Sequence, residues 1–81
     1  MQREELEQMG IVPLAVLCGE LANDSEAEIS VAETAGQLKH EWAMLVARQT
    51  PPPPDYNEMK NLESEQAALR KRMIDFLSVA G

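Results

Sequence analysis

The 81-residue sequence contains little of what enzyme and metal sites are built from. It has a single cysteine, Cys18, and a single histidine, His40, so it has neither a disulfide framework nor a ligand set for a metal ion. HExxH, CxxC and glycine-rich phosphate loops do not occur in it. We therefore expect no cofactor, no metal and no enzymatic activity, with Cys18 as a small buried filler and His40 exposed to solvent.

Long apolar runs and a basic N-terminus are also missing. No apolar run approaches the roughly 20 residues of a transmembrane helix, and the acidic start lacks the basic segment of a signal peptide. We expect a cytoplasmic protein that binds no membrane. The net charge of −7, from 14 acidic and 7 basic residues, disfavours direct nucleic-acid binding through phosphate contacts. The same charge suits a basic protein partner, such as a DNA-binding regulator.

Proline is concentrated at one place, Thr50-Pro51-Pro52-Pro53-Pro54-Asp55. A helix does not cross such a run, because proline lacks an N–H group and drives the preceding residue out of the helical region. The run separates two apolar-periodic segments of nearly equal length, 25–49 and 55–79. We interpret it as the bend of a long helical hairpin; the alternatives are a flexible linker or an SH3-type ligand.

The apolar residues of both segments alternate at spacings of three and four, which is typical of an antiparallel coiled coil. Folding the chain about position 52 brings Arg48 opposite Glu58 and leaves Glu41 opposite Glu65 as a mismatch of like charges. We expect this seam to bury eight residues: Val31, Leu38, Trp42, Leu45, Leu62, Leu69, Met73 and Phe76.

Capping signals predict where the two long helices begin. Ser25-Glu26-Ala27-Glu28 has the form of a capping box, and Asp55-Tyr56-Asn57-Glu58 has a similar form with aspartate as the cap. These signals place the two arms at 25–49 and 55–79.

The chain before the hairpin predicts a short helix over 13–22. Pro13 suits its first position, and one face carries Leu14, Leu17, Cys18 and Leu21. Residues 1–12 are charged and interrupted by Gly10, so we expect a helical turn or a flexible acidic arm.

The whole chain, 1–81, is expected to be one all-α domain. A two-helix hairpin encloses no core of its own, so the short helix, a second copy or a partner must cover it. We expect homodimerisation into a helical bundle. Ile74 and Leu77 lie off the strict seam and are candidates for contact with a second chain or with the short helix.

Negative charge is concentrated near the start of the chain. Residues 1–30 hold one arginine and seven acids, which gives −6 of the total of −7. The simplest interpretation is solubility and helix capping; a sharper one is a surface for a basic partner. The candidate partner-binding residues are Glu4, Glu5, Glu7, Glu20, Asp24, Ile74 and Leu77. Arg70-Lys71-Arg72 is expected to be solvated.

A family resemblance rests on three stretches: the Pro13-Leu14 helix with Leu17 and Leu21, Ile29 in the long helix, and Glu65-Gln66-Ala67-Ala68-Leu69 running to Leu77. In these stretches the sequence resembles the TraM-type quorum-sensing antiactivators. The resemblance implies a small helical protein that binds a LuxR-type regulator and blocks its DNA binding. The proline run departs from the family pattern, so no residue roles are transferred.

Two functions follow as hypotheses. The first is a regulatory protein that binds and sequesters a partner, a LuxR-type transcription regulator. The second is a chaperone-like or structural subunit of a secretion or phage assembly, whose hairpin completes another protein's helical bundle.

Overall fold

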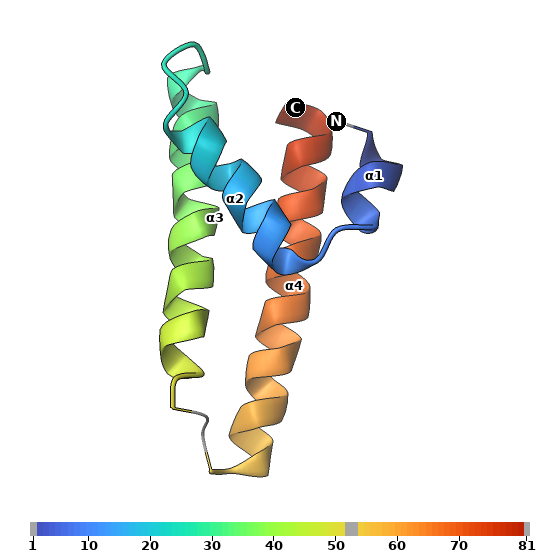
Figure 1. The fold of residues 1–81 in the computed structure, drawn as a ribbon, viewed down its shortest axis with the longest axis vertical. Helices are drawn as coiled ribbons and strands as arrows, with labels where there is room; N and C mark the ends of the chain where they lie inside the picture. Colours follow the sequence, from blue (N-terminus) through green and yellow to red (C-terminus); the bar gives the residue numbers. More distant parts are fainter. Residues whose placement is uncertain (1, 52–53, 81) are drawn as a thin grey trace.

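The protein is described here by a computed structural model that covers residues 2–51 and 54–80. Over these residues it forms four helices and no strand: α1 (Arg3–Glu7), α2 (Ile11–Ala22), α3 (Ile29–Arg48) and α4 (Tyr56–Ala80). The predicted all-α class and the long hairpin are confirmed, since α3 and α4 run in opposite directions along the long axis (Figure 1).

The arrangement of α2 changes the predicted hairpin. α2 crosses in front of the long helices and contacts both of them, while α1 packs against α4 (Figure 1). The contact between α2 and α3 is more extensive than the contact between α3 and α4. The two long helices therefore do not pack against each other along their whole length.

The core is one cluster to which every helix contributes. Five of the eight predicted seam residues are buried in it: Leu38, Leu45, Leu62, Leu69 and Met73. Val31, Trp42 and Phe76 are half-buried, and the last two pack against the cluster. The predicted seam is thus correct for the five buried residues and wrong in assigning full burial to Val31, Trp42 and Phe76.

The N-terminal third supplies the cover that the hairpin lacks. The core side chains from α1 and α2 are Leu6, Ile11, Leu14, Ala15 and Cys18. Full burial of one leucine side chain contributes about 1.5–3 kcal/mol, so this set is a large part of the core. Of the two alternatives for residues 1–12, the structure shows the helical turn, as α1, and not the flexible arm, because α1 and the start of α2 are packed.

α3 begins later than predicted, at Ile29 instead of Ser25. The Asp24 side chain accepts a hydrogen bond from the Glu26 backbone N–H (2.9 Å), and the helix cap is Glu28, which makes no side-chain capping bond. Aspartate stabilises such local turns in competition with helix. The predicted capping box at Ser25 is therefore wrong.

The other helix starts are closer to prediction. α2 begins at Ile11, with Pro13 inside its first turn instead of at its first position. Proline is tolerated there because the first N–H groups of a helix have no partner within it. Asp55 does cap α4, since its side chain accepts a hydrogen bond from the Asn57 N–H (2.9 Å). Two prolines of the predicted bend, at positions 52 and 53, lie outside the described residues.

Two ion pairs fix the register between the long helices. Arg48 pairs with Glu65 at 2.8 Å, and Glu41 pairs with Arg72 at 2.9 Å. The predicted partner of Arg48 was Glu58, seven residues earlier (65 − 58 = 7). The register is therefore shifted by one heptad, about 10 Å along the helix. The shift replaces the predicted clash of Glu41 with a glutamate by an ion pair with an arginine.

Candidate functional site

α1 is held on α4 by a buried leucine. Leu6 is fully buried, although α1 has only five residues. A helix of that length is not stable in water by itself. Its order therefore depends on the contacts that it makes with α4.

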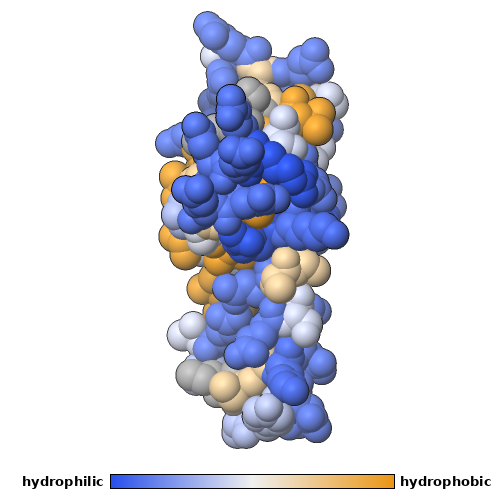
Figure 2. Space-filling model, turned by 90° about the vertical axis from the view of Figure 1, so that its right-hand side faces the viewer, coloured by the Kyte–Doolittle hydropathy of each residue, from blue (hydrophilic) through white to orange (hydrophobic). Residues whose placement is uncertain are grey.

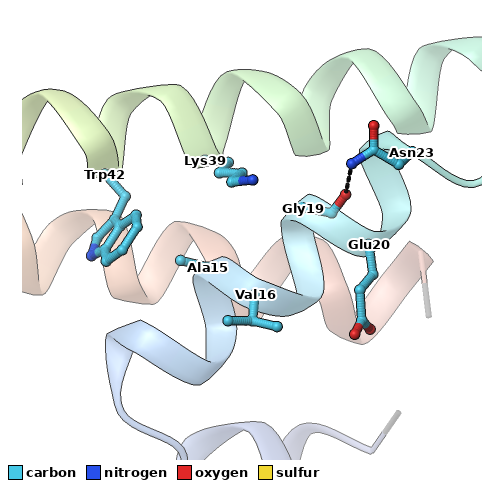
Figure 3. A pocket seen from close by; sticks show the side chains of 7 residues that line it. All are labelled: Ala15, Val16, Gly19, Glu20, Asn23, Lys39 and Trp42. Atoms are coloured by element: carbon cyan, nitrogen blue, oxygen red, sulfur yellow. Dashed lines mark hydrogen bonds between the residues drawn. The ribbon is translucent and has the colours of Figure 1, made fainter.

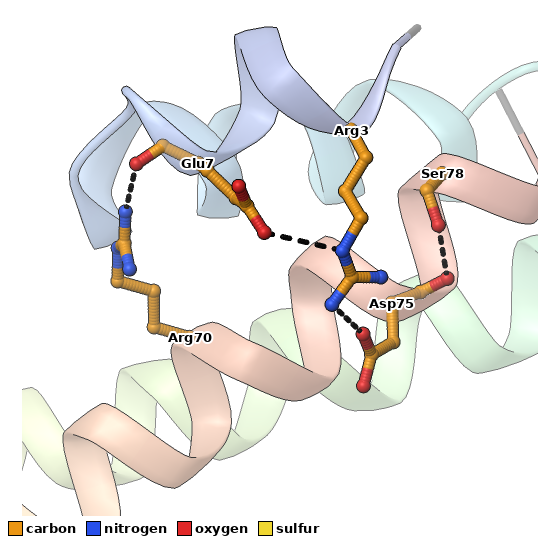
Figure 4. A network of polar contacts seen from close by, with 5 residues as sticks. All are labelled: Arg3, Glu7, Arg70, Asp75 and Ser78. Carbon is orange, nitrogen blue, oxygen red and sulfur yellow. Dashed lines mark hydrogen bonds and ion pairs between the residues drawn. The ribbon is translucent and has the colours of Figure 1, made fainter.

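Arg70 of α4 closes the end of α1 (Figure 4). Its guanidinium donates hydrogen bonds to the backbone carbonyl oxygens of Glu7 (2.7 Å) and Met9 (2.8 Å and 3.0 Å). The last carbonyls of a helix lack partners within it and carry partial negative charge, so a cation is favourable here. The expectation that Arg70 is merely solvated is wrong.

Arg3 forms a second link between α1 and α4. Its guanidinium lies 2.6 Å from the Asp75 carboxylate and 3.2 Å from that of Glu7 (Figure 4). The hydrogen bond to Asp75 is the main cause that raises the pKa of Arg3 above its ordinary value. These side chains are about half exposed, so solvent screens the link and it adds little to stability.

These contacts order three carboxylates at the surface. Glu4, Glu5 and Glu7 of α1 are exposed, and we call them the acidic face. Figure 2 looks at the molecule from the side of α1 and α4 and shows mostly hydrophilic residues there. Of the three, Glu7 is committed to Arg3, while Glu4 and Glu5 make no ion pair within the described part of the chain.

The remaining predicted partner-binding residues do not join the acidic face. Glu20 is in the last turn of α2 and Asp24 follows that helix, and this end of α2 lies beside α3, away from α1 (Figure 1). Ile74 and Leu77 are buried, with 4% and 3% of their surfaces exposed. They are therefore not exposed for contact with a second chain, and their burial in the core that α2 shares agrees with the other alternative, packing against the short helix.

A second surface is the groove between α2 and α3. It is open, has a volume of about 520 Å³, and is lined by Ala15, Val16, Gly19, Glu20, Asn23, Lys39 and Trp42 (Figure 3). Trp42 lies toward one end of it, Lys39 and Val16 near its middle, and Glu20 and Asn23 toward the other end. Val12, four residues before Val16 on α2, is 55% exposed.

Gly19 makes room for a cation in this groove. A Cβ atom at Gly19 would lie 3.0 Å from the Lys39 Nζ and 3.1 Å from its Cδ. The Lys39 side chain therefore lies against the backbone of α2.

The groove was missed in the sequence because α2 was assigned a single apolar face. A signal for it was present: Val12, Val16 and Glu20 recur every four residues on the side of α2 away from Leu14 and Cys18. The helix is apolar on two sides, and the structure buries only one of them.

The residues with potential chemistry stay apart. Cys18 is a free, buried thiol, and burial raises the pKa of its thiol, which keeps it protonated and unreactive. His40 is exposed, as predicted. Within 2–51 and 54–80, no group of three histidine, cysteine, aspartate or glutamate side chains is placed to hold a metal ion.

None of the helices in the described ranges combines the length and apolar character needed to cross a membrane. Comparison of the chain with protein-family models, with curated proteins and with solved structures finds no match.

Proposed function

We propose that this chain is a non-enzymatic cytoplasmic protein that binds and sequesters a basic protein partner. The partner class that we propose is a transcription regulator of the LuxR type, with the acidic face as the contact surface. This function is an antiactivator function, and it matches what the resemblance to TraM-type proteins implies.

The observation that supports the proposal is the ordered state of α1. Arg70 and Leu6 hold a five-residue helix in place, and that helix presents Glu4 and Glu5 to solvent with no ion pair to any of the described residues. Because the backbone that carries Glu4 and Glu5 is already ordered, it loses little conformational entropy on binding. Carboxylates on an acidic protein also attract a basic DNA-binding surface and speed association.

The closed core gives this proposal more support than the alternative. A hairpin that completes another protein's bundle would expose its apolar stripe until the partner arrives. Here, Leu62, Leu69 and Met73 have at most 3% of their surfaces exposed. The chain covers its own hairpin with α1 and α2.

The test is binding to a purified LuxR-type regulator from the same organism, measured by calorimetry and by release of the regulator from its DNA. The variant is Glu4→Lys/Glu5→Lys, which spares the Arg3–Glu7 pair. Two charge reversals at the contact are expected to weaken binding at least tenfold, and the loss is expected to shrink at high salt.

The matched control is Glu33→Lys/Glu58→Lys. It changes the net charge by the same amount, and both residues are exposed on the long helices. Equal weakening by both double variants would mean that general charge attraction, and not a specific contact at the acidic face, drives binding. Full binding by the Glu4→Lys/Glu5→Lys protein would overturn the acidic face as the binding surface.

A further inference from the structure

One side of the long hairpin is covered by neither α1 nor α2. There α3 and α4 border an open hollow of about 370 Å³, and every residue that lines it belongs to these two helices. α2 lies on the other side of α3, because Lys39 and Trp42, which line the groove beside α2, are about half a turn around the helix from Met44. We call the uncovered side the outer face, and six of its residues carry its charge and its exposed apolar surface: Glu41, Met44, Arg48, Glu65, Ala68 and Arg72.

Two ion pairs lie at the ends of the outer face, and they run in opposite senses. In the Arg48–Glu65 pair α3 supplies the cation and α4 the anion. In the Glu41–Arg72 pair α3 supplies the anion and α4 the cation. The two pairs are seven residues apart on each helix (48 − 41 = 7 and 72 − 65 = 7), which is about 10 Å. Positive and negative charges therefore alternate around a rectangle.

This alternating pattern is complementary to a second copy of itself. With a two-fold axis parallel to the helices, α4 of one copy lies over α3 of the other at the same level, and Glu65 faces Arg48. With a two-fold axis across the helices, each helix lies over its own copy in reverse, and Glu41 faces Arg48. In both arrangements every glutamate of one copy faces an arginine of the other, and each contact occurs twice, as an isologous interface requires.

The middle of the outer face, between the two ion pairs, is apolar. Leu45 and Leu69 line the hollow there and are buried, while Met44 and Ala68 are exposed, Met44 by 53%. An axis through the middle of the rectangle places these apolar residues against those of the second copy. Methionine adapts its shape to such a contact because its side chain is unbranched and polarizable.

The local charge balance favours a second copy over other occupants. The chain has 14 acidic and 7 basic residues, but the outer face carries two of each. One heptad away on the same sides of the helices, Gln37 and Asn61 are uncharged and Asp75 is paired with Arg3. A basic partner is attracted to the acidic parts of the molecule instead. Two chains of net charge −7 approach each other most easily on a face whose own charges sum to zero.

The ion pairs also keep donors for a second copy. Each is held by one hydrogen bond, from Arg48 Nη1 to Glu65 and from Arg72 Nη1 to Glu41. A guanidinium has five N–H groups, so each arginine can bond a carboxylate of the second copy while it keeps its own. The pairs then form one network, which contributes more than isolated exposed pairs do.

We infer that the outer face is the interface of a homodimer, in which the alternating charges of α3 and α4 face their opposites in the second copy and Met44 is covered. This interface differs from the one that the sequence suggested, because Ile74 and Leu77 take no part in it. It is independent of the proposed regulator binding, since α1 contributes no residue to the outer face.

The first test measures the mass of the full chain by sedimentation equilibrium between about 1 µM and about 1 mM. The expected result is a reversible dimer. Met44→Glu brings two carboxylates into the apolar middle and is expected to raise the dimer Kd roughly tenfold or more. Val12→Glu is the matched control: it adds the same charge at a valine of α2 that is 55% exposed, and it is expected to leave the Kd unchanged.

The decisive variant exchanges the signs of all four charges: Glu41→Arg, Arg48→Glu, Glu65→Arg and Arg72→Glu. It keeps both ion pairs within the chain, in reversed sense, so it changes only the contacts between copies. The reversed chain is expected to dimerise with itself like the parent. With the parent, every contact joins like charges, so mixed dimers are expected to be roughly tenfold rarer than in a random mixture. Native mass spectrometry of the reversed chain with isotopically labelled parent measures them.

Three outcomes would overturn the inference. The first is a monomer at every concentration. The second is a dimer that Met44→Glu weakens no more than Val12→Glu does, which would place the interface elsewhere. The third is random mixing of the parent with the reversed chain, which would remove the four charges from the interface. Circular dichroism shows whether the reversed chain keeps its helices; if it does not, the comparison of Met44→Glu with Val12→Glu decides. Failure of the proposed regulator binding would leave these results untouched.

Discussion

The guanidinium of Arg70 holds the carbonyl oxygen of Met9 with two hydrogen bonds, 3.0 Å from Nε and 2.8 Å from Nη2. The two residues are 61 positions apart in the chain. This contact, with a further bond to the Glu7 carbonyl, fixes where α1 ends against α4. It orders the five residues of α1, which would not form a stable helix alone, on the surface of the protein.

Replacing Arg70 is therefore expected to release α1. Arg70→Lys keeps the charge but loses the planar fork that reaches two carbonyls, and Arg70→Gln loses the charge as well. Loss of hydrogen bonds from a charged donor is expected to cost about 1.5–3 kcal/mol. Hydrogen exchange is the measurement: the Leu6 and Met9 amides, both bonded within the α1 region, are expected to exchange faster.

Lys71→Gln is the matched control, because Lys71 is an exposed neighbour. It changes the same charge without touching α1 and is expected to leave these amides protected. Unchanged exchange in Arg70→Gln would mean that Leu6 and the Arg3–Asp75 link keep α1 in place without Arg70.

The one-heptad shift between α3 and α4 can be tested by charge reversal. Arg48→Glu places two acids together at the Glu65 contact and is expected to lower the free energy of unfolding by about 0.2–1 kcal/mol. Addition of Glu65→Lys is expected to recover the loss, because it restores an opposite-charge pair. Urea denaturation of the single and double variants gives the coupling energy.

Glu58→Lys in the Arg48→Glu protein is the control for the register. It is the reversal that the sequence-based pairing would require, and it is expected to recover nothing. If Glu58→Lys, and not Glu65→Lys, recovered the free energy of unfolding, the register would be the one predicted from the sequence.

The hairpin could be predicted because its signals are local. Apolar spacing in both arms and the proline run between them each dictate a backbone state without reference to the rest of the chain. The register could not be predicted in the same way, since a shift of seven residues returns the same stripe to the same face. Only the partners of single charges, such as Arg48 and Glu41, distinguish the two registers.

α1 and the groove depend on contacts across the chain. Nothing near Leu6 shows that it is buried, because the cavity that receives it and the arginine that holds it come from α4. Likewise, the apolar residues of α2 predicted a helix with one buried side. That Val12 and Val16 stay exposed depends on how α2 lies across the two long helices.

Gly19→Ala tests how closely Lys39 lies on α2. Alanine favours a helix over glycine by about 1 kcal/mol, but its Cβ would lie 3.0 Å from the Lys39 ammonium. Because that atom ends a flexible, exposed side chain, it is expected to move aside, and the variant is expected to be more stable by about 0.5–1 kcal/mol in thermal denaturation. The same substitution in a Lys39→Ala protein is expected to gain slightly more, and a net loss in both would show that the helix backbone itself resists the added atom.

The buried thiol of Cys18 predicts a dependence of stability on alkaline pH. Burial raises its pKa in the folded state, so the unfolded chain loses the thiol proton at a lower pH than the folded chain does. Above the pKa of an exposed thiol, about 8.5, the unfolded state binds fewer protons and stability falls as the pH rises. The contribution is complete below that pH, and by about pH 9.5 up to about 1 kcal/mol of it is expected to be lost.

The measurement is the free energy of unfolding at neutral and alkaline pH for the parent and for Cys18→Ala, under reducing conditions. Cys18→Ala is expected to be less stable at neutral pH because of the space it leaves in the core, and to lose less on going alkaline. Parallel curves for the two proteins would mean that the thiol is as accessible to water in the folded chain as in the unfolded one.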